Sequence, residues 1–109
     1  MRRGDVWTVA AGSGYLGKPR PAVILQDDRF DATASVTVCA FTRDATDAPL
    51  LRLLVLPTET NGLDAPSRLM VDKLTTVSRD KLGRRLGQLD REDLVRLDRS
   101  ILVFLGHAG

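Results

Sequence analysis

The segment Pro21-Ala22-Val23-Ile24-Leu25-Gln26 decides the fold, because it is apolar on both faces, as a buried central strand is. Proline has no N–H group to donate to a ladder, so we expect Pro21 to be the first residue of this strand. The preceding residues, 11–19, contain three glycines and a proline, a composition typical of a loop. The sequence therefore predicts a central strand that follows directly on a glycine-rich loop.

Short strands separated by turn signals are predicted on both sides of this segment. The β-branched stretch Ser35–Thr42 is typical of a strand. Asn61-Gly62 is a turn dipeptide within the long connection that follows it. One helical turn is expected within Arg79–Arg85. The remaining strands are expected at residues 5–10, 50–56, 68–72 and 74–77, with a bend at Lys73 between the last two, and at 87–89.

An amphipathic helix is predicted after Asp90, which is expected to be its N-cap, and before Gly106, a stop signal. One face of this helix is apolar, because hydrophobic residues recur at three- and four-residue spacing: Leu94, Leu97, Ile101, Phe104 and Leu105. Several short strands closed by one helix predict a mainly β fold. We expect a small curled antiparallel barrel forming a single domain over residues 1–109.

The composition narrows the class of protein. With 43% hydrophobic and 28% charged residues, the 109-residue chain is typical of a folded globular domain. Cys39, the only cysteine, excludes an internal disulfide and is expected to be a packed thiol. Together with the single histidine, His107, it is too few for a structural zinc site, so we expect no metal and no cofactor.

Targeting signals and net charge add two expectations. No apolar stretch approaches the length of a membrane span, and the basic N-terminus lacks the apolar region of a signal peptide, so we expect a cytoplasmic protein without a membrane partner. The net charge of +2, with both signs interspersed, is too weak by itself to indicate nucleic-acid binding.

Arg20 is the most informative candidate for chemistry, since the common nucleotide-binding and metalloprotease motifs are absent from the sequence. A single histidine also excludes a two-histidine ribonuclease mechanism. Pro19 and Pro21 restrict the backbone on both sides of Arg20, which favours one direction for its guanidinium and suits it to bind a phosphate. The alternative is an ordinary arginine at a strand edge.

Thr42 and Asp72 are the other candidates. Thr42 ends a predicted strand beside Arg43, so its hydroxyl is placed to bind a phosphate oxygen, or is simply a β-former at a strand end. Asp72 shares its predicted strand with Leu69, Met70 and Val71, and a carboxylate in such surroundings needs a partner. A functional role and a structural ion pair are both open for Asp72.

Together these segments resemble the MazF/PemK toxins. The resemblance is carried in order by Arg3-Gly4-Asp5-Val6-Trp7, the glycine-rich loop into Arg20-Pro21-Ala22-Val23-Ile24-Leu25, the strand that ends at Thr42, Met70-Val71-Asp72-Lys73 with Thr76-Val77, and Leu86-Gly87-Gln88-Leu89 before the last helix. It implies an SH3-like barrel of the CcdB/MazF type, a two-fold homodimer and an acidic antitoxin partner. It also implies metal-independent cleavage of single-stranded mRNA to 2′,3′-cyclic phosphate and 5′-hydroxyl ends, which inhibits growth.

The resemblance assigns roles to individual residues. Arg20 and Thr42 correspond to the family's central pair, with Arg20 as the group that stabilises the phosphorane charge. Asp72 or Tyr15 is expected to assist proton transfer. RNA binding is expected from Tyr15, Lys18, Arg43 and Lys73, and stacking on bases from Trp7, Tyr15 and Phe41, with a core position as the alternative for Trp7.

One departure from the family pattern leaves the general base open. Many members have a glutamate in the loop before the arginine, whereas residues 14–19 here contain no acid and Tyr15 lies near that position. Two further functions therefore stay open. One is a non-catalytic gyrase poison of the CcdB type, although this chain lacks the Trp-Gly-Ile ending of such proteins. The other is a catalytically dead homologue that acts only as a corepressor.

Overall fold

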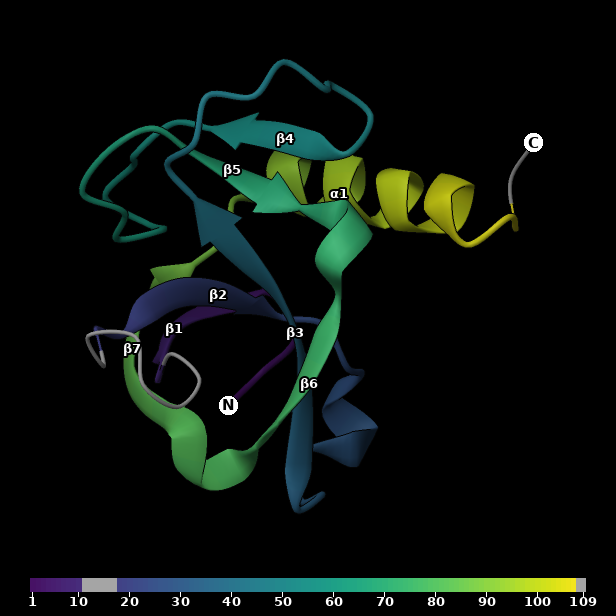
Figure 1. The fold of residues 1–109 in the computed structure, drawn as a ribbon. Coiled ribbons are helices and arrows are strands. Elements are labelled where there is room, and N and C mark those ends of the chain that lie inside the picture. The colour runs from purple at the N-terminus through teal and green to yellow at the C-terminus, as the bar shows by residue number, and fades with distance from the viewer. Residues whose placement is uncertain (11–17, 108–109) are drawn as a thin grey trace.

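The structure, a computed structural model, describes residues 1–10 and 18–107 (Figure 1). Seven strands and one α-helix lie in this part of the chain, with three single 3-10 turns between strands. The strands are β1 (Asp5–Val9), β2 (Arg20–Ile24), β3 (Ser35–Thr42), β4 (Arg52–Val55), β5 (Ser67–Met70), β6 (Thr75–Ser78) and β7 (Leu82–Gln88). The turns are η1 (Asp28–Phe30), η2 (Val71–Lys73) and η3 (Arg79–Lys81), and the helix is α1 (Arg91–Phe104).

The strands form one curled antiparallel sheet in the order β4-β5-β3-β2-β1-β7. β3 is the longest strand and has two partners along one side, because η2 interrupts the chain between β5 and β6. β6 pairs with Ser35–Val38 of β3, whereas β5 pairs with Phe41 and Thr42. Figure 1 shows the sheet wrapping round on itself with α1 across one end. The prediction of a small, mainly β barrel with a C-terminal helix is confirmed, although β4 and β7 remain the two ends of an open path.

Apolar side chains pack on both faces of the curled sheet. The larger cluster lies under α1, where Leu97 is fully buried and belongs to one cluster with Val23, Phe41 and Leu69 among others. The smaller cluster contains Ala22, Ile24, Val36 and Val38, with Trp7 packed against it. Cys39 belongs to the larger cluster, and burial raises the pKa of its thiol to about 12. The packed-thiol prediction is therefore confirmed.

The predicted start of the central strand is wrong by one residue, because β2 begins at Arg20. Arg20 pairs with Val9 of β1, and Pro21 pairs with Thr8. The ladder to β3 starts only at Ala22, so the missing N–H of Pro21 interrupts no pairing on that side.

Most other strand boundaries also differ from the prediction by one or more residues, and the larger differences have a clear cause. β4 begins at Arg52 and not at Leu50, because the N–H groups of Leu51 and Arg52 donate to the Ala48 carbonyl and close a turn. The helical turn is limited to η3, and β7 extends over 82–88, because pairing with β1 from Val9–Leu82 to Asp5–Gln88 outweighs local preference.

The ends of the predicted helix agree with the structure. Asp90 is the N-cap residue, but its carboxylate accepts a hydrogen bond from Thr58 Oγ1 (3.3 Å) and makes no capping bond. Gly106 has a φ of 80°, a left-handed conformation that ends helices, which confirms the stop signal. No helix in the described ranges is long and apolar enough to cross a membrane.

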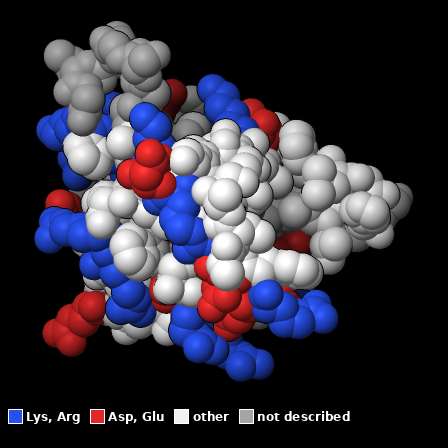
Figure 2. All heavy atoms as spheres, turned by 90° about the horizontal axis from the view of Figure 1, so that it is seen from below, with Lys and Arg blue, Asp and Glu red and all other residues white. Residues whose placement is uncertain are grey.

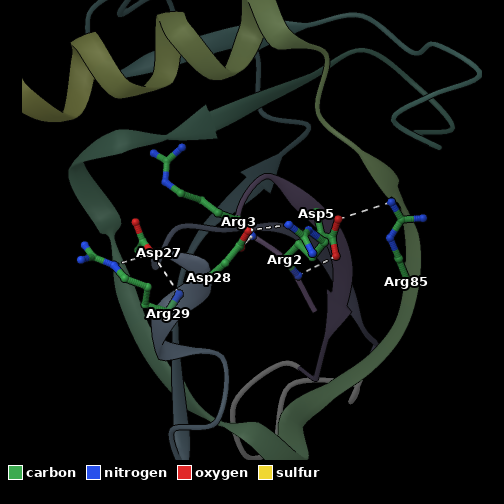
Figure 3. Close-up of polar contacts among 7 residues, drawn as sticks. All are labelled: Arg2, Arg3, Asp5, Asp27, Asp28, Arg29 and Arg85. Carbon is green, nitrogen blue, oxygen red and sulfur yellow. Dashed lines mark hydrogen bonds and ion pairs between the residues drawn. The ribbon is translucent and has the colours of Figure 1, made fainter.

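The N-terminal Arg-Gly-Asp segment is a structural anchor (Figure 3). Asp5 is only 3% exposed and accepts hydrogen bonds from the Arg2 N–H (2.8 Å) and from Arg85 Nη2 (3.3 Å). Arg2 is ion paired with Asp28 of η1, and Arg3 with Asp98 of α1. These arginines therefore neutralise carboxylates and tie β1 to η1, β7 and α1.

Candidate active-site cleft

An open cleft of about 610 Å³ lies where the start of β2, the end of β3 and the middle of β7 meet. The loop that precedes β5 closes its remaining side. The lining residues come from these four segments and from Thr8 of β1: Lys18, Pro19, Arg20, Pro21, Phe41, Thr42, Arg43, Gly62, Leu63, Asp64, Ser67, Gly83, Arg84 and Leu86.

The predicted pair Arg20 and Thr42 both line this cleft. In the antiparallel ladder of β2 and β3, Ala22 pairs with Ala40, Val23 with Cys39 and Ile24 with Val38. Arg20 precedes this ladder by two residues and Thr42 follows it by two, so both lie just beyond the same end of the ladder, where β2 and β3 border the cleft. Arg20 is exposed and Thr42 half-buried, so both are accessible from the cleft.

Glycines allow the cleft wall to form. A Cβ on Gly83 would lie 2.3 Å from Thr8 Oγ1, and a Cβ on Gly62 would lie 2.2 Å from the Leu86 carbonyl oxygen. Gly62 also has a φ of 69°, which other residues rarely adopt. The Gly62 contact shows that the loop before β5 packs closely against the β7 backbone, whereas the Gly83 contact packs β7 against the Thr8 side chain of β1.

Asn61 holds this loop in place. The residue is fully buried, and its Oδ1 accepts hydrogen bonds from the N–H groups of Thr58 and Leu63, both at 3.0 Å. Its Nδ2 donates to the Leu56 carbonyl at 2.9 Å. The predicted Asn61-Gly62 turn is confirmed, and the buried amide gives the loop its shape.

The cleft is electropositive. Four cationic side chains line it, Lys18, Arg20, Arg43 and Arg84, against one carboxylate, Asp64. Within the described part of the chain, none of these five forms an ion pair. Figure 2 shows Lys and Arg side chains gathered along the left flank of the face seen from below, the side on which Figure 1 draws β7 and the start of β2. Such a surface attracts phosphate groups.

Arg84 and Asp64 are cleft residues that the sequence analysis did not identify. Arg84 and Arg85 are adjacent in the sequence but diverge in the structure. Arg84 lines the cleft, and its N–H donates to Thr8 Oγ1 (2.9 Å), whereas Arg85 is paired with Asp5. The alternation of side chains along a strand would have separated the two arginines, had the extent of β7 been predicted.

Asp72 does not line the cleft and does not lie on a strand as predicted. It belongs to η2, and its carboxylate is ion paired with Arg52, whose side chain is 15% exposed. The chain turns at η2 because β5 and β6 pair with different parts of β3. This arrangement favours the structural alternative for Asp72.

The remaining predicted site residues lie in different parts of the structure, and not all of them line the cleft. Lys18 and Arg43 line the cleft and are exposed, whereas Lys73 is exposed but lies in η2 outside the lining. The prediction that Phe41 stacks on bases is wrong, because the ring is 2% exposed and packs in the core. Trp7 packs against the smaller cluster, as its core alternative predicted. Tyr15 lies outside the described residues.

The chain is similar to known toxins over nearly its whole length. It matches the family model of PemK-like, MazF-like toxins of type II toxin-antitoxin systems over residues 2–105. It is 61% identical over 109 residues to a probable endoribonuclease MazF of Mycolicibacterium smegmatis, and the match covers 100% of both chains.

Solved structures share the fold. An endoribonuclease in complex with its cognate antitoxin, from a mycobacterial species, matches with a TM-score of 0.80 at 21% identity, over 97% of this chain and 95% of that one. A MazE-MazF structure from Deinococcus radiodurans matches with a TM-score of 0.81 at 18% identity, over 99% and 98% of the two chains. The 61% identity over full length and the family match over 2–105 show that this chain belongs to the PemK/MazF-like toxins of type II toxin-antitoxin systems.

Proposed function

We propose that this toxin is an endoribonuclease that cuts single-stranded mRNA in the Arg20–Thr42 cleft without a metal ion and thereby inhibits translation and growth. The observation that carries the proposal is that Arg20 and Thr42 lie beyond the same end of the β2–β3 ladder and line one cleft, which four cationic side chains border. The 61%-identical relative is itself named a probable endoribonuclease MazF. We place this activity in the cytoplasm, where mRNA is found.

In the proposed reaction, the RNA 2′-oxygen attacks the adjacent phosphorus, the P–O5′ bond breaks, and a 2′,3′-cyclic phosphate and a 5′-hydroxyl result. The 2′-hydroxyl loses a proton and the leaving 5′-oxygen gains one, so the step needs no oxidant, reductant or other co-reactant. Arg20 would stabilise the phosphorane charge, because guanidinium stays cationic and binds two oxygens at once. Thr42 would donate a hydrogen bond to a non-bridging oxygen.

The other residues have supporting roles in this proposal. Lys18 and Arg43 would bind phosphates of the RNA strand on either side of the cut, and Tyr15 and Lys73 would extend that path. Asp72 would act by holding Arg52 and the η2 turn in place rather than by proton transfer, since it lies outside the cleft lining.

Cleavage by the purified chain tests the proposal. We expect single-stranded RNA to be cut in excess EDTA, with cyclic phosphate and 5′-hydroxyl ends found by end-mapping. Double-stranded RNA of the same sequence is the control and should stay intact. A folded chain that leaves RNA intact but traps gyrase on DNA would replace this function by that of a CcdB-type poison. If the folded chain neither cuts RNA nor traps gyrase, the corepressor function remains.

The partner that we propose is an acidic antitoxin encoded beside this chain. A free ribonuclease would harm its own cell, and an inhibitor that competes with RNA for an electropositive cleft needs negative charge. A flexible segment that becomes ordered on binding suits an open cleft of this kind. It would cover Arg20 and the flanking segments 11–19 and 43–49. The mycobacterial structural relative was solved with its cognate antitoxin.

A homodimer is the second part of the proposed assembly, and we place its interface at the C-terminal half of α1. Leu50, Val103 and Phe104 are 71%, 51% and 45% exposed and border a hollow of about 420 Å³, with Leu51, Pro49, Ala48 and Ser100 as its other lining residues. Large exposed apolar patches on small proteins mark interaction sites. The patch has no charged lining residue, so an acidic antitoxin gains no ion pair there, whereas a second copy presents the same apolar patch across a two-fold axis.

Phe104→Lys is expected to convert the dimer into a monomer, because it places a charge in the centre of this interface. Light scattering should give about twice the 11.9 kDa chain mass for the parent and the chain mass for the variant. Phe30→Lys, which changes an exposed phenylalanine in η1, is the matched control and should leave the dimer intact. A parent chain that is monomeric at micromolar concentration would contradict the proposal, as would a Phe104→Lys variant that stays dimeric.

A further inference from the structure

We infer that Asp64 is the general base that removes the proton from the attacking 2′-hydroxyl. This inference rests on the proposed ribonuclease function and names the group that the family resemblance left open. Asp64 is the one carboxylate among the described residues that line the cleft with Arg20 and Thr42. The proton acceptor must lie within hydrogen-bond reach of the reacting oxygen, so only groups that line the cleft qualify.

The other candidate bases do not meet this condition. Asp72 lies outside the lining and is paired with Arg52. Residues 11–17, which precede the cleft segment, contain no aspartate, glutamate or histidine in their sequence. Tyr15 lies among them, outside the described residues, and carries a phenol in place of a carboxylate. His107 follows the end of α1 and does not line the cleft.

Buried residues and hydrogen bonds fix the position of the loop that carries Asp64. Buried residues flank it on both sides, with Leu63 at 8% and Ser67 at 5% exposure, and Leu63 N–H donates to the buried Asn61 amide. Ser67 Oγ donates to the Ala65 carbonyl at 3.0 Å. Ser67 starts β5, whose next residue, Arg68, pairs with Thr42. Asp64 therefore lies on a short, anchored segment that leads directly to the strand beside Thr42.

The charge of Asp64 makes its role distinguishable from that of an RNA-binding residue. It is exposed and forms no ion pair with any described residue. It shares the cleft lining with four cations, Lys18 and Arg20 of the β2 side, Arg43 after β3 and Arg84 of β7. A carboxylate in a phosphate-binding cleft repels RNA. Its removal should therefore tighten RNA binding while it slows cleavage, two effects of opposite sign.

In the proposed step, a carboxylate oxygen of Asp64 accepts the 2′-hydroxyl proton as the 2′-O–P bond forms. The P–O5′ bond then breaks, the leaving 5′-oxygen takes a proton from solvent water, and Asp64 returns its proton to solvent. Protons and electrons balance over the cycle, and the product ends are those of the proposed function.

Asp64→Asn is expected to lower the single-turnover cleavage rate by about a hundredfold, the scale of losing a general base. The probe is a single-stranded RNA that contains the mapped cleavage site. The same RNA with a 2′-O-methyl group at that site cannot be cut, and the variant should bind it as tightly as the parent or more tightly. Glu59→Gln, which neutralises an exposed carboxylate of the same loop outside the lining, is the matched control and should cut like the parent.

Rescue by a small carboxylate supplies the second test. Asp64→Ala leaves room for formate, so formate should restore part of its cleavage rate when compared with chloride at the same ionic strength. Arg20→Ala should gain nothing from formate. If the parent cuts RNA and Asp64→Asn cuts within threefold of it, the assignment of Asp64 is wrong while the ribonuclease function stands. A slow Asp64→Asn variant with equally weakened RNA binding, or an Asp64→Ala variant that formate does not rescue, would overturn it too. A parent that cuts no RNA contradicts the proposed function itself.

Discussion

Arg20→Ala is expected to slow RNA cleavage by a hundredfold to a thousandfold, the range found when a group that stabilises transition-state charge is removed. Arg20 is exposed and forms no ion pair among the described residues, so the substitution should leave the fold intact. Single-turnover cleavage of an RNA that contains the mapped site measures the loss. Circular dichroism and the melting temperature show whether the variant is folded.

Two further variants sharpen this prediction. Arg20→Lys keeps the charge but loses the planar group that binds two oxygens at once, so its rate should fall between those of Arg20→Ala and the parent. Arg29→Ala removes an exposed arginine of η1 that is ion paired with Asp27 and does not line the cleft, and it should have the parent rate. If folded Arg20→Ala cuts as fast as the parent, the cleft is not the active site.

Asn61→Ala is expected to lower the free energy of unfolding by about 3 kcal/mol, because it leaves several polar groups without partners at a cost of roughly 1–3 kcal/mol each where they are shielded from water. These groups are the N–H of Thr58, the N–H of Leu63 and the carbonyl of Leu56. Urea denaturation measures the change as a lower midpoint with an unchanged slope.

The same substitution should also reduce cleavage at temperatures where the protein is folded, since Asn61 shapes the loop that forms one wall of the cleft and carries Asp64. Glu59→Gln, two residues away and exposed, should leave both stability and cleavage unchanged. A loss of under about 1 kcal/mol for Asn61→Ala would mean that water replaces the amide and that the loop does not depend on it.

Local patterns in the sequence determined the elements of this protein. Residues 21–26 had to be interior because they are apolar on both faces, and Ala22, Val23 and Ile24 are buried. The spacing of Leu94, Leu97 and Ile101 set the helix face that packs on the sheet. Arg20 was recognisable as a constrained cation because two prolines flank it. These features depend on neighbours in the chain, which a sequence displays directly.

The tertiary structure alone decided which side chains meet. The extent of β7 is set by pairing with β1, about 80 residues away in the chain, so the separation of Arg84 from Arg85 was not visible locally. The sequence indicated that the Asp72 carboxylate needs a partner, but only the structure identifies Arg52 as that partner. Asp64 lies in a polar loop where the turn dipeptide Asn61-Gly62 predicts a change of chain direction but no function. It reaches the cleft because the buried Asn61 amide and the close approach of Gly62 to the Leu86 carbonyl hold that loop against β7. Long-range strand pairing and close backbone approach join residues far apart in the chain, so no periodic pattern of hydrophobic residues in the sequence reveals them.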